Sequence, residues 1–273
     1  MSSDKPKSPS LLSDLPYWLF VLIAVSLVIL AIMFASETHR PIVYAVADGV
    51  LVTVRVTIIA FALSLALGTL VALGLVSRRR WLREALTAYV EVMRGVPMLV
   101  LLYYVAFAAG PAIVGGYAET FKPLIDAGLL PAITLRDFGF EWRAVTALTL
   151  GYSAFIAEVV RGGIESIPKG QSEAAQALGL SRWKTLRFIV LPQAFKNMLP
   201  PLGNDLVSML KDSSLVSALG VGDITQIGKT YSAATFLFFE TYTVVAIYYL
   251  IMTIGLSLLI RRLEKRLRRN EQR

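Results

Sequence analysis

The sequence predicts an all-α, polytopic membrane protein with about six transmembrane helices. Of its 273 residues, 56% are hydrophobic and the mean hydropathy is +0.63, which exceeds the apolar character of an ordinary soluble domain. Several apolar stretches approach the roughly 20 residues that an α-helix needs to cross the hydrocarbon core. The basic residues gather beside these stretches, as expected where they set the orientation of a chain in a membrane.

These stretches predict one transmembrane domain over residues 16–260. Its expected helices lie at about 16–36, 49–76, 86–110, 143–165, 194–211 and 240–260. The first has no charged residue and is too long for the core of a secretory signal, so we interpret it as a retained helix. The second is long enough to tilt, and Arg55 near its start can extend toward the headgroups.

Proline and glycine mark the expected breaks. Pro97 suits the first turn of the third helix or a kink in it. A loop is expected at 111–142, with a short helix at 118–127. Pro200, Pro201 and Gly203 are expected to interrupt the fifth helix, whose hydropathy is the weakest.

Charge predicts the topology. Placing both termini in the cytoplasm puts most of the 27 basic residues inside or at the inner edge. Residues 1–15 then form a cytoplasmic N-terminal tail, 166–193 a cytoplasmic loop, and 261–273 a basic cytoplasmic C-terminal tail. The formal net charge of +8 is explained by this orientation, and nucleic acid is not an expected partner.

Composition also limits the chemistry. The chain has no cysteine and a single histidine, His39, which makes disulfide, thiolate and zinc chemistry poor expectations. A near match to a phosphate-binding loop begins at Gly222, but five residues separate it from Gly228 where that loop has four. This segment is expected to form a short outer helix between the fifth and sixth spans, with turns at Gly220 and Gly222.

The cytoplasmic loop predicts two short helices that meet at a glycine. Pro168 suits a first helical position, and Gly179 stands where a left-handed cap would end the first helix. Ser181 can cap a second helix, which Pro192 helps to end. Three alanines, at positions 174, 175 and 177, make a small face beside the charge of Glu173, which favours docking by a partner. The alternative is a folded loop that packs only on its own bundle.

This loop resembles the EAA signature of the membrane subunits of bacterial ABC importers. The matching residues are Glu173, Ala174, Ala175, Gly179, Ile189, Leu191 and Pro192. The resemblance implies a type I ABC importer permease fold, in which this loop places a coupling helix in a groove of a cytoplasmic ATPase.

The resemblance extends over about 49–267. Glu91, Arg94, Gly95 and Pro97 are similar to the family's E-x-x-R-G-x-P segment, and 153–164 resembles its A-Y-x-A-E-x-x-R-G-G-I segment. Similar segments continue at 191–194, 202–204 and 210–215. Together they indicate the polar amino acid branch, which takes histidine, glutamate, glutamine, arginine or opines. Two features depart from the pattern: Phe155 occupies a usual small-residue position, and the loop at 111–142 is longer than expected.

Ionisable and polar residues near the bilayer are candidates for the translocation path or gate. Glu158 and Arg161 are three residues apart, as are Glu91 and Arg94, so each pair can neutralise itself within a helix or hold an inner gate. A second group lies on the interrupted fifth helix, where free backbone groups can face a polar cavity. Its members are Asn204, Asp205, Ser208 and Lys211.

The resemblance implies a permease subunit in the bacterial inner membrane that carries a polar amino acid. Its implied partners are two ATP-binding subunits, a second permease subunit as homodimer or heterodimer, and an extracytoplasmic amino-acid-binding protein. ATP and Mg²⁺ belong to the ATPase partner, and this chain needs no cofactor or metal. One alternative is a proton-coupled secondary transporter that uses Glu158 or Asp205. A membrane-bound enzyme is another, but the sequence offers no nucleophile–base pair or metal cluster for it.

Overall fold

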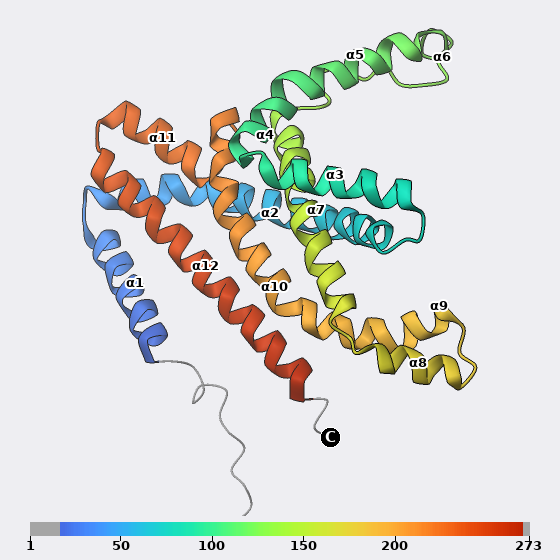
Figure 1. Ribbon diagram of the computed structural model, residues 1–273. Coiled ribbons are helices and arrows are strands. Elements are labelled where there is room, and N and C mark those ends of the chain that lie inside the picture. Colours follow the sequence, from blue (N-terminus) through green and yellow to red (C-terminus); the bar gives the residue numbers. More distant parts are fainter. Residues whose placement is uncertain (1–16, 270–273) are drawn as a thin grey trace, which may run out of the picture.

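The computed structural model describes residues 17–269, and within them the chain is helical, with no β-strand. Figure 1 shows the helices in chain order. The long ones are α1 (Tyr17–Ala35), α2 (His39–Leu75), α3 (Arg80–Gly95), α7 (Phe140–Glu165), α10 (Leu191–Asp212) and α12 (Phe238–Arg269). The shorter ones are α4 (Met98–Tyr104), α5 (Gly110–Thr120), α6 (Lys122–Asp126), α8 (Lys169–Ala177), α9 (Arg182–Thr185) and α11 (Ile224–Thr235). The expected N-terminal tail at 1–15 and the last four residues, 270–273, lie outside the described part.

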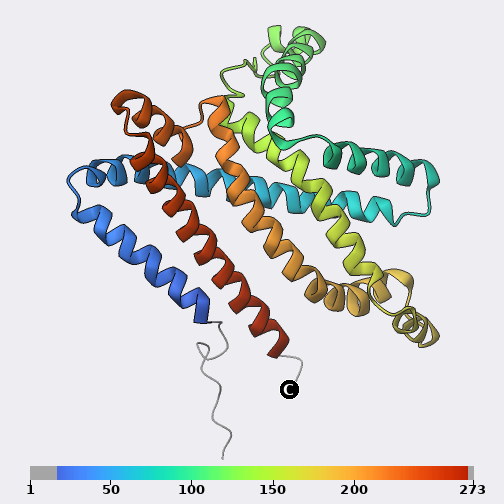
Figure 2. The same ribbon diagram turned by 60° about the vertical axis from the view of Figure 1, so that its left-hand side comes forward.

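α7 is the centre of the bundle. α2 packs along it, and α10 packs on both α7 and α12. In both views α1, α12 and α10 run side by side, while α2 crosses them steeply (Figures 1 and 2). A Cβ on Gly68 of α2 would lie 2.7 Å from the Ser153 carbonyl oxygen of α7, so only glycine permits this close crossing.

Four described helices are long and apolar enough to cross a membrane. They are His39–Leu75, Met98–Thr120, Phe140–Glu165 and Phe238–Arg266, and a shorter apolar helix covers Val21–Ala35. α10 is not among them, because its sequence carries several charged and amide side chains. This agrees with the weak hydropathy noted for the fifth expected span.

The second helix begins ten residues earlier than the expected position 49, at His39. Pro41 sits in its first turn, and Ile42, Val43 and Val46 are fully buried against α11 and α12, so packing carries the helix through this polar start. Arg55 is consequently in mid-helix, where it pairs with Glu141 of α7 at 2.7 Å.

The expected third helix at 86–110 is wrong, because two helices meet at Pro97. Val96 and Pro97 are both extended, since a residue before proline avoids helical geometry. α3 ends before this break, and the apolar helix after it continues through a π-helical segment, Val105–Ala109, into α5. Most of the expected loop is therefore helical, because α5 extends an existing helix and needs no new nucleus.

Helix α10 is continuous through Pro200 and Pro201, so the interruption expected in the fifth span is also wrong. Ala194, Met198 and Leu202 are buried around the prolines, and this packing outweighs the loss of two backbone donors. α12 likewise continues to Arg269 through the expected basic tail, whose residues are good helix formers.

The expected short helix between the last two spans is present as α11. Asp223 caps it by accepting hydrogen bonds from the N–H groups of Thr225 at 3.1 Å and Gln226 at 3.0 Å. Gly220 makes the preceding turn at a φ of 76°. Gly222 and Gly228 therefore flank a capped helix start and do not form a phosphate loop.

Candidate functional site

The hairpin of α8 and α9 follows directly from α7 and projects from the bundle (Figure 1). Gly179 adopts a φ of 83°, which confirms the expected left-handed cap. Its N–H donates to the Gln176 carbonyl at 2.9 Å, and the Leu180 N–H donates to the Ala175 carbonyl at 3.1 Å. This bond pair is the Schellman arrangement, which fixes the turn between the two helices.

The second helix of the hairpin, α9, begins at its expected cap, but the helical chain does not end at Pro192 as expected. The Ser181 hydroxyl caps α9 by accepting a bond from the Lys184 N–H at 3.4 Å. Pro192 does not end a helix, because the chain passes through a π-helical segment, Leu186–Val190, straight into α10. The Leu191 N–H reaches back five residues to the Leu186 carbonyl. This shift lets Pro192, which has no N–H, sit in the first turn of α10 without breaking the helix.

The residues of the EAA signature divide between the outside and the inside of the hairpin. Ala175 is buried, whereas Ala174 and Ala177 are exposed, so the expected small face is split. Successive helical residues are about 100° apart, which explains why neighbouring alanines face different ways. Glu173 and Pro192 are exposed, while Ile189 and Leu191 are half-buried.

Three large apolar side chains of the hairpin face solvent. Leu178 is 84% exposed, Trp183 64% and Phe188 63%. The hairpin also borders an open groove of about 690 Å³, which is lined by the end of α7, by α8 and α9, and by the π-helical segment Leu186–Val190. Glu173 lines this groove together with Glu165, Lys169 and Arg182. Apolar side chains next to charged ones are the composition of a protein-docking surface.

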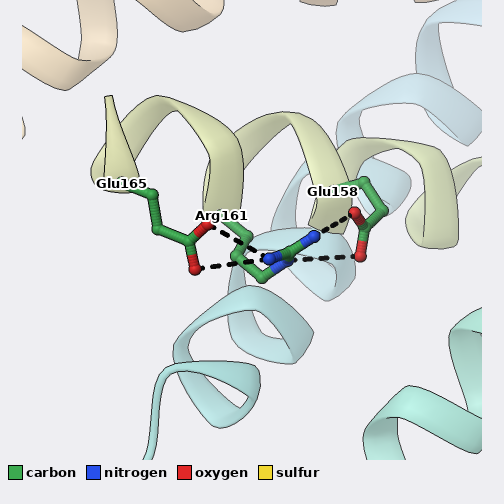
Figure 3. A network of polar contacts seen from close by, with 3 residues as sticks. All are labelled: Glu158, Arg161 and Glu165. Carbon is green, nitrogen blue, oxygen red and sulfur yellow. Dashed lines mark hydrogen bonds and ion pairs between the residues drawn. The ribbon is translucent and has the colours of Figure 1, made fainter. Parts of the chain in front are cut away.

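A charge network lies on the last two turns of α7 (Figure 3). The Arg161 Nη2 lies 2.6 Å from Glu158 Oε2, and Nη1 lies 3.1 Å from Glu165 Oε2. The pairing of Glu158 with Arg161 is confirmed. The sequence reasoning missed Glu165, although its spacing of four residues from Arg161 is a pairing signal. Because Glu165 also lines the groove, the network adjoins the hairpin.

Arg94 does not pair with Glu91, which corrects the expectation of a second intrahelical pair. Both residues are exposed on α3, and the Arg94 guanidinium lies over the Phe155 ring of α7, 5.7 Å from its centroid. A cation over an aromatic face is attracted by the ring quadrupole. Phe155, which departs from the family pattern, therefore supplies the contact that the pairing rule did not foresee.

The polar residues of α10 differ in their exposure. Asn204 and Lys211 are exposed, whereas Asp205 and Ser208 are half-buried. The Asp205 Oδ2 atom is buried without a hydrogen-bond partner. Sequence reasoning missed the contact in which the Tyr152 hydroxyl donates to the Asp212 carboxylate at 2.8 Å. It joins α7 to α10, and no sequence pattern indicates it, because Tyr152 lies in an apolar stretch.

A helical bundle with several membrane-length helices and an exposed hairpin is the fold of a polytopic membrane protein. The protein-family model described as "Binding-protein-dependent transport system inner membrane component" matches residues 64–269 of this chain. The chain belongs to this family and is the permease component of an amino acid ABC importer. It is a multi-pass inner-membrane protein and is not itself catalytic.

The curated relatives include two glutamine transport permeases. The glutamine transport system permease protein GlnP of Escherichia coli K12 is 32% identical over 228 residues, with 84% of this chain and 95% of the relative covered. The probable glutamine ABC transporter permease protein GlnM of Bacillus subtilis 168 is 36% identical over 223 residues, covering 82% and 93%.

Solved structures agree on the fold. A structure described as an amino acid ABC transporter with histidines superposes with a TM-score of 0.67 at 30% identity, covering 84% of this chain and 95% of the other. An inward-facing MetNI methionine ABC transporter superposes with a TM-score of 0.65 at 22% identity, covering 85% and 99%, which supports the fold alone.

Proposed function

We propose that the α8–α9 hairpin is the element through which a separate ATPase drives this permease. The observation that carries the proposal is a rigid hairpin with exposed Leu178, Trp183 and Phe188 at its surface. Such a hairpin can seat in a groove of a partner and transmit its displacement to α7 and α10, to which it is directly joined. Glu173 then acts as a contact, and ATP and Mg²⁺ bind in the partner.

The proposed orientation places the hairpin and both termini in the cytoplasm. The start of α1, the end of α12 and the hairpin lie toward the same end of the bundle, whereas α5, α6 and α11 lie toward the opposite end (Figures 1 and 2). Basic side chains are frequent at the first end and favour the cytoplasmic side. The opposite end then faces an extracytoplasmic amino-acid-binding protein.

The proposed assembly pairs this chain with a second permease subunit, identical or related, and with two ATPase subunits. The proposed substrate is a polar amino acid, in line with the glutamine named for the relatives and the histidines named for the solved structure. The candidate path and gate residues are Glu91, Arg94, Glu158, Arg161, Asn204, Asp205, Ser208 and Lys211.

Substitution of Gly179 by valine tests the coupling. A β-branched residue is strongly disfavoured at positive φ, so the Schellman turn should reorganise and the hairpin lose its shape. In the reconstituted assembly, Gly179→Val should abolish binding-protein-stimulated ATP hydrolysis and uptake while membrane insertion is retained. The matched control is Gly170→Val, because Gly170 lies in α8 without a positive φ and a Cβ added there would meet nothing within 4 Å.

Normal uptake by Gly179→Val would show that the hairpin does not couple the ATPase to the permease. Uptake that survives loss of the ATPase but collapses with the proton gradient would instead favour a proton-coupled transporter.

A further inference from the structure

Arg143 is a buried cation that binds backbone carbonyls. It lies in the first turn of α7 and is 7% exposed. Its Nε donates to the Phe138 carbonyl at 2.6 Å, Nη1 to the Ala106 carbonyl at 2.9 Å, and Nη2 to the Leu135 carbonyl at 3.0 Å. The guanidinium lies 4.9 Å from the Phe140 ring centroid and 5.8 Å from that of Phe138. Three hydrogen bonds and two ring faces compensate its loss of water.

The Ala106 carbonyl needs this donor because of the local sequence. In an α-helix it would accept from the Gly110 N–H, but that N–H bonds to the Val105 carbonyl in the π-helical segment Val105–Ala109. The π-helical partner of Ala106, five residues on, is Pro111, which has no N–H. A buried carbonyl without a backbone donor requires another partner, and Arg143 supplies it.

Residues 110–139, which we name the arm, lie between the segments that Arg143 joins. α5 and α6 of the arm project away from the bundle in both views (Figures 1 and 2). The Tyr117 hydroxyl donates to the Pro131 carbonyl at 3.0 Å, which ties the outgoing part of the arm to its return. In the return, the Thr134 hydroxyl and N–H donate to Asp137 at 2.7 and 2.8 Å and lower the pKa of that carboxyl.

We infer that Arg143 is the positioning residue that fixes the arm on α7. Its contacts fall on both sides of the arm's base, with Ala106 before the arm and Leu135 and Phe138 in its return. A planar guanidinium can satisfy three carbonyls in fixed directions, which a lysine ammonium cannot do. We therefore expect the angle between the arm and α7 to depend on this side chain, in addition to the packing of the Phe107 ring on the Phe140 ring at 5.7 Å.

Spin-label distances test this directly, because the chain has no native cysteine. One label pair joins Glu119 on the arm to Lys229 on α11, and a reference pair joins Gln176 on α8 to Lys229; all three positions are exposed. The full chain is measured in lipid nanodiscs, with singly labelled samples defining distances between chains. Arg143→Gln should broaden the Glu119–Lys229 distribution about twofold, because the base of the arm opens locally, and leave the reference pair unchanged.

Two variants sharpen the outcome. Arg143→Lys should restore part of the narrow distribution, because it keeps the charge without the fork of donors. Arg136→Gln removes an exposed cation from the same return segment and should change nothing. An unchanged arm distribution in Arg143→Gln overturns the inference. Broadening of both label pairs also overturns it, because Arg143 would then support the whole fold. If Arg143→Gln cannot be purified, Arg143→Lys decides: a Glu119–Lys229 distribution as narrow as that of the wild type also overturns the inference.

A second measurement rests on the proposed function, in which this end of the bundle meets the binding protein. Arg143→Gln should raise the binding-protein concentration for half-maximal ATPase stimulation about tenfold, with a smaller change in the maximal rate, because a mobile arm must be ordered on binding. Arg143→Lys should recover part of this loss. If Arg143→Gln broadens the Glu119–Lys229 distribution but leaves the half-maximal binding-protein concentration unchanged, the arm takes no part in docking of the binding protein. Absence of stimulation in the wild-type assembly contradicts the proposed function itself.

Discussion

The two π-helical segments have the same backbone construction in opposite surroundings. In each, a five-residue segment is followed by one residue and then a proline, with Pro111 after Val105–Ala109 and Pro192 after Leu186–Val190. In each, the next N–H reaches back five residues, from Gly110 to Val105 and from Leu191 to Leu186. The second carbonyl of each segment thereby loses both of its helical donors.

The two segments differ in how that carbonyl is satisfied. Ala106 is buried, and its carbonyl accepts from Arg143 on another helix. Arg187, at the equivalent position of the second segment, is an exposed residue, and we expect water to satisfy its carbonyl. The first segment is therefore fixed by a tertiary contact at the base of the arm. We expect the second, at the base of the hairpin, to be solvated and easier to bend, which suits an element that transmits movement.

Removing one arginine at each segment, the donor Arg143 at the first and the exposed Arg187 within the second, should separate the two segments most strongly. Arg143→Met leaves the Ala106 carbonyl buried without a donor, which should lower the free energy of unfolding by about 1–3 kcal/mol. Arg187→Met changes an exposed side chain and should change the free energy of unfolding by less than about 0.5 kcal/mol. Thermal unfolding of the two purified variants in one detergent measures the difference. A shift in Arg143→Met as small as the one expected for Arg187→Met would show that the Arg143 hydrogen bonds add nothing to stability.

Restoring the missing N–H gives a smaller but more specific test. Pro111→Ala supplies a backbone donor five residues after Ala106, so it should offset part of the damage in Arg143→Met. A double-mutant cycle should give a favourable coupling of about 1 kcal/mol between the two positions. The same cycle with Arg187→Met and Pro192→Ala should give no coupling, because the Arg187 guanidinium lies over the Phe188 ring and is not expected to donate to that carbonyl. Strict additivity at the first pair would mean that the Ala106 carbonyl does not need Arg143.

Local chemistry made some of this structure predictable from the sequence. The turn at Gly179, the cap at Ser181 and the pair Glu158–Arg161 depend on neighbours within a few residues, so spacing rules are sufficient for them. α10 runs through Pro200 because burial against other helices outweighs a local rule. The Arg143 contacts join residues up to 37 positions apart, and no local pattern indicates them. Sequence thus predicted the hairpin and missed the contacts between helices.

The charge network at the end of α7 should give the smallest effect, because it is local and solvated. The Arg161 and Glu165 side chains are 36% and 55% exposed, so water and salt weaken their attraction. Glu165→Gln should lower the free energy of unfolding by about 0.3–0.5 kcal/mol, the range for exposed helical pairs. Thermal unfolding at 0.1 M and 1 M salt (about 10 and 3 Å screening lengths) should show this difference shrinking, whereas the Arg143→Met effect should persist because its contacts are buried. A Glu165→Gln effect that is large and independent of salt would place this network with the buried contacts of Arg143 and not with the solvated surface of the hairpin.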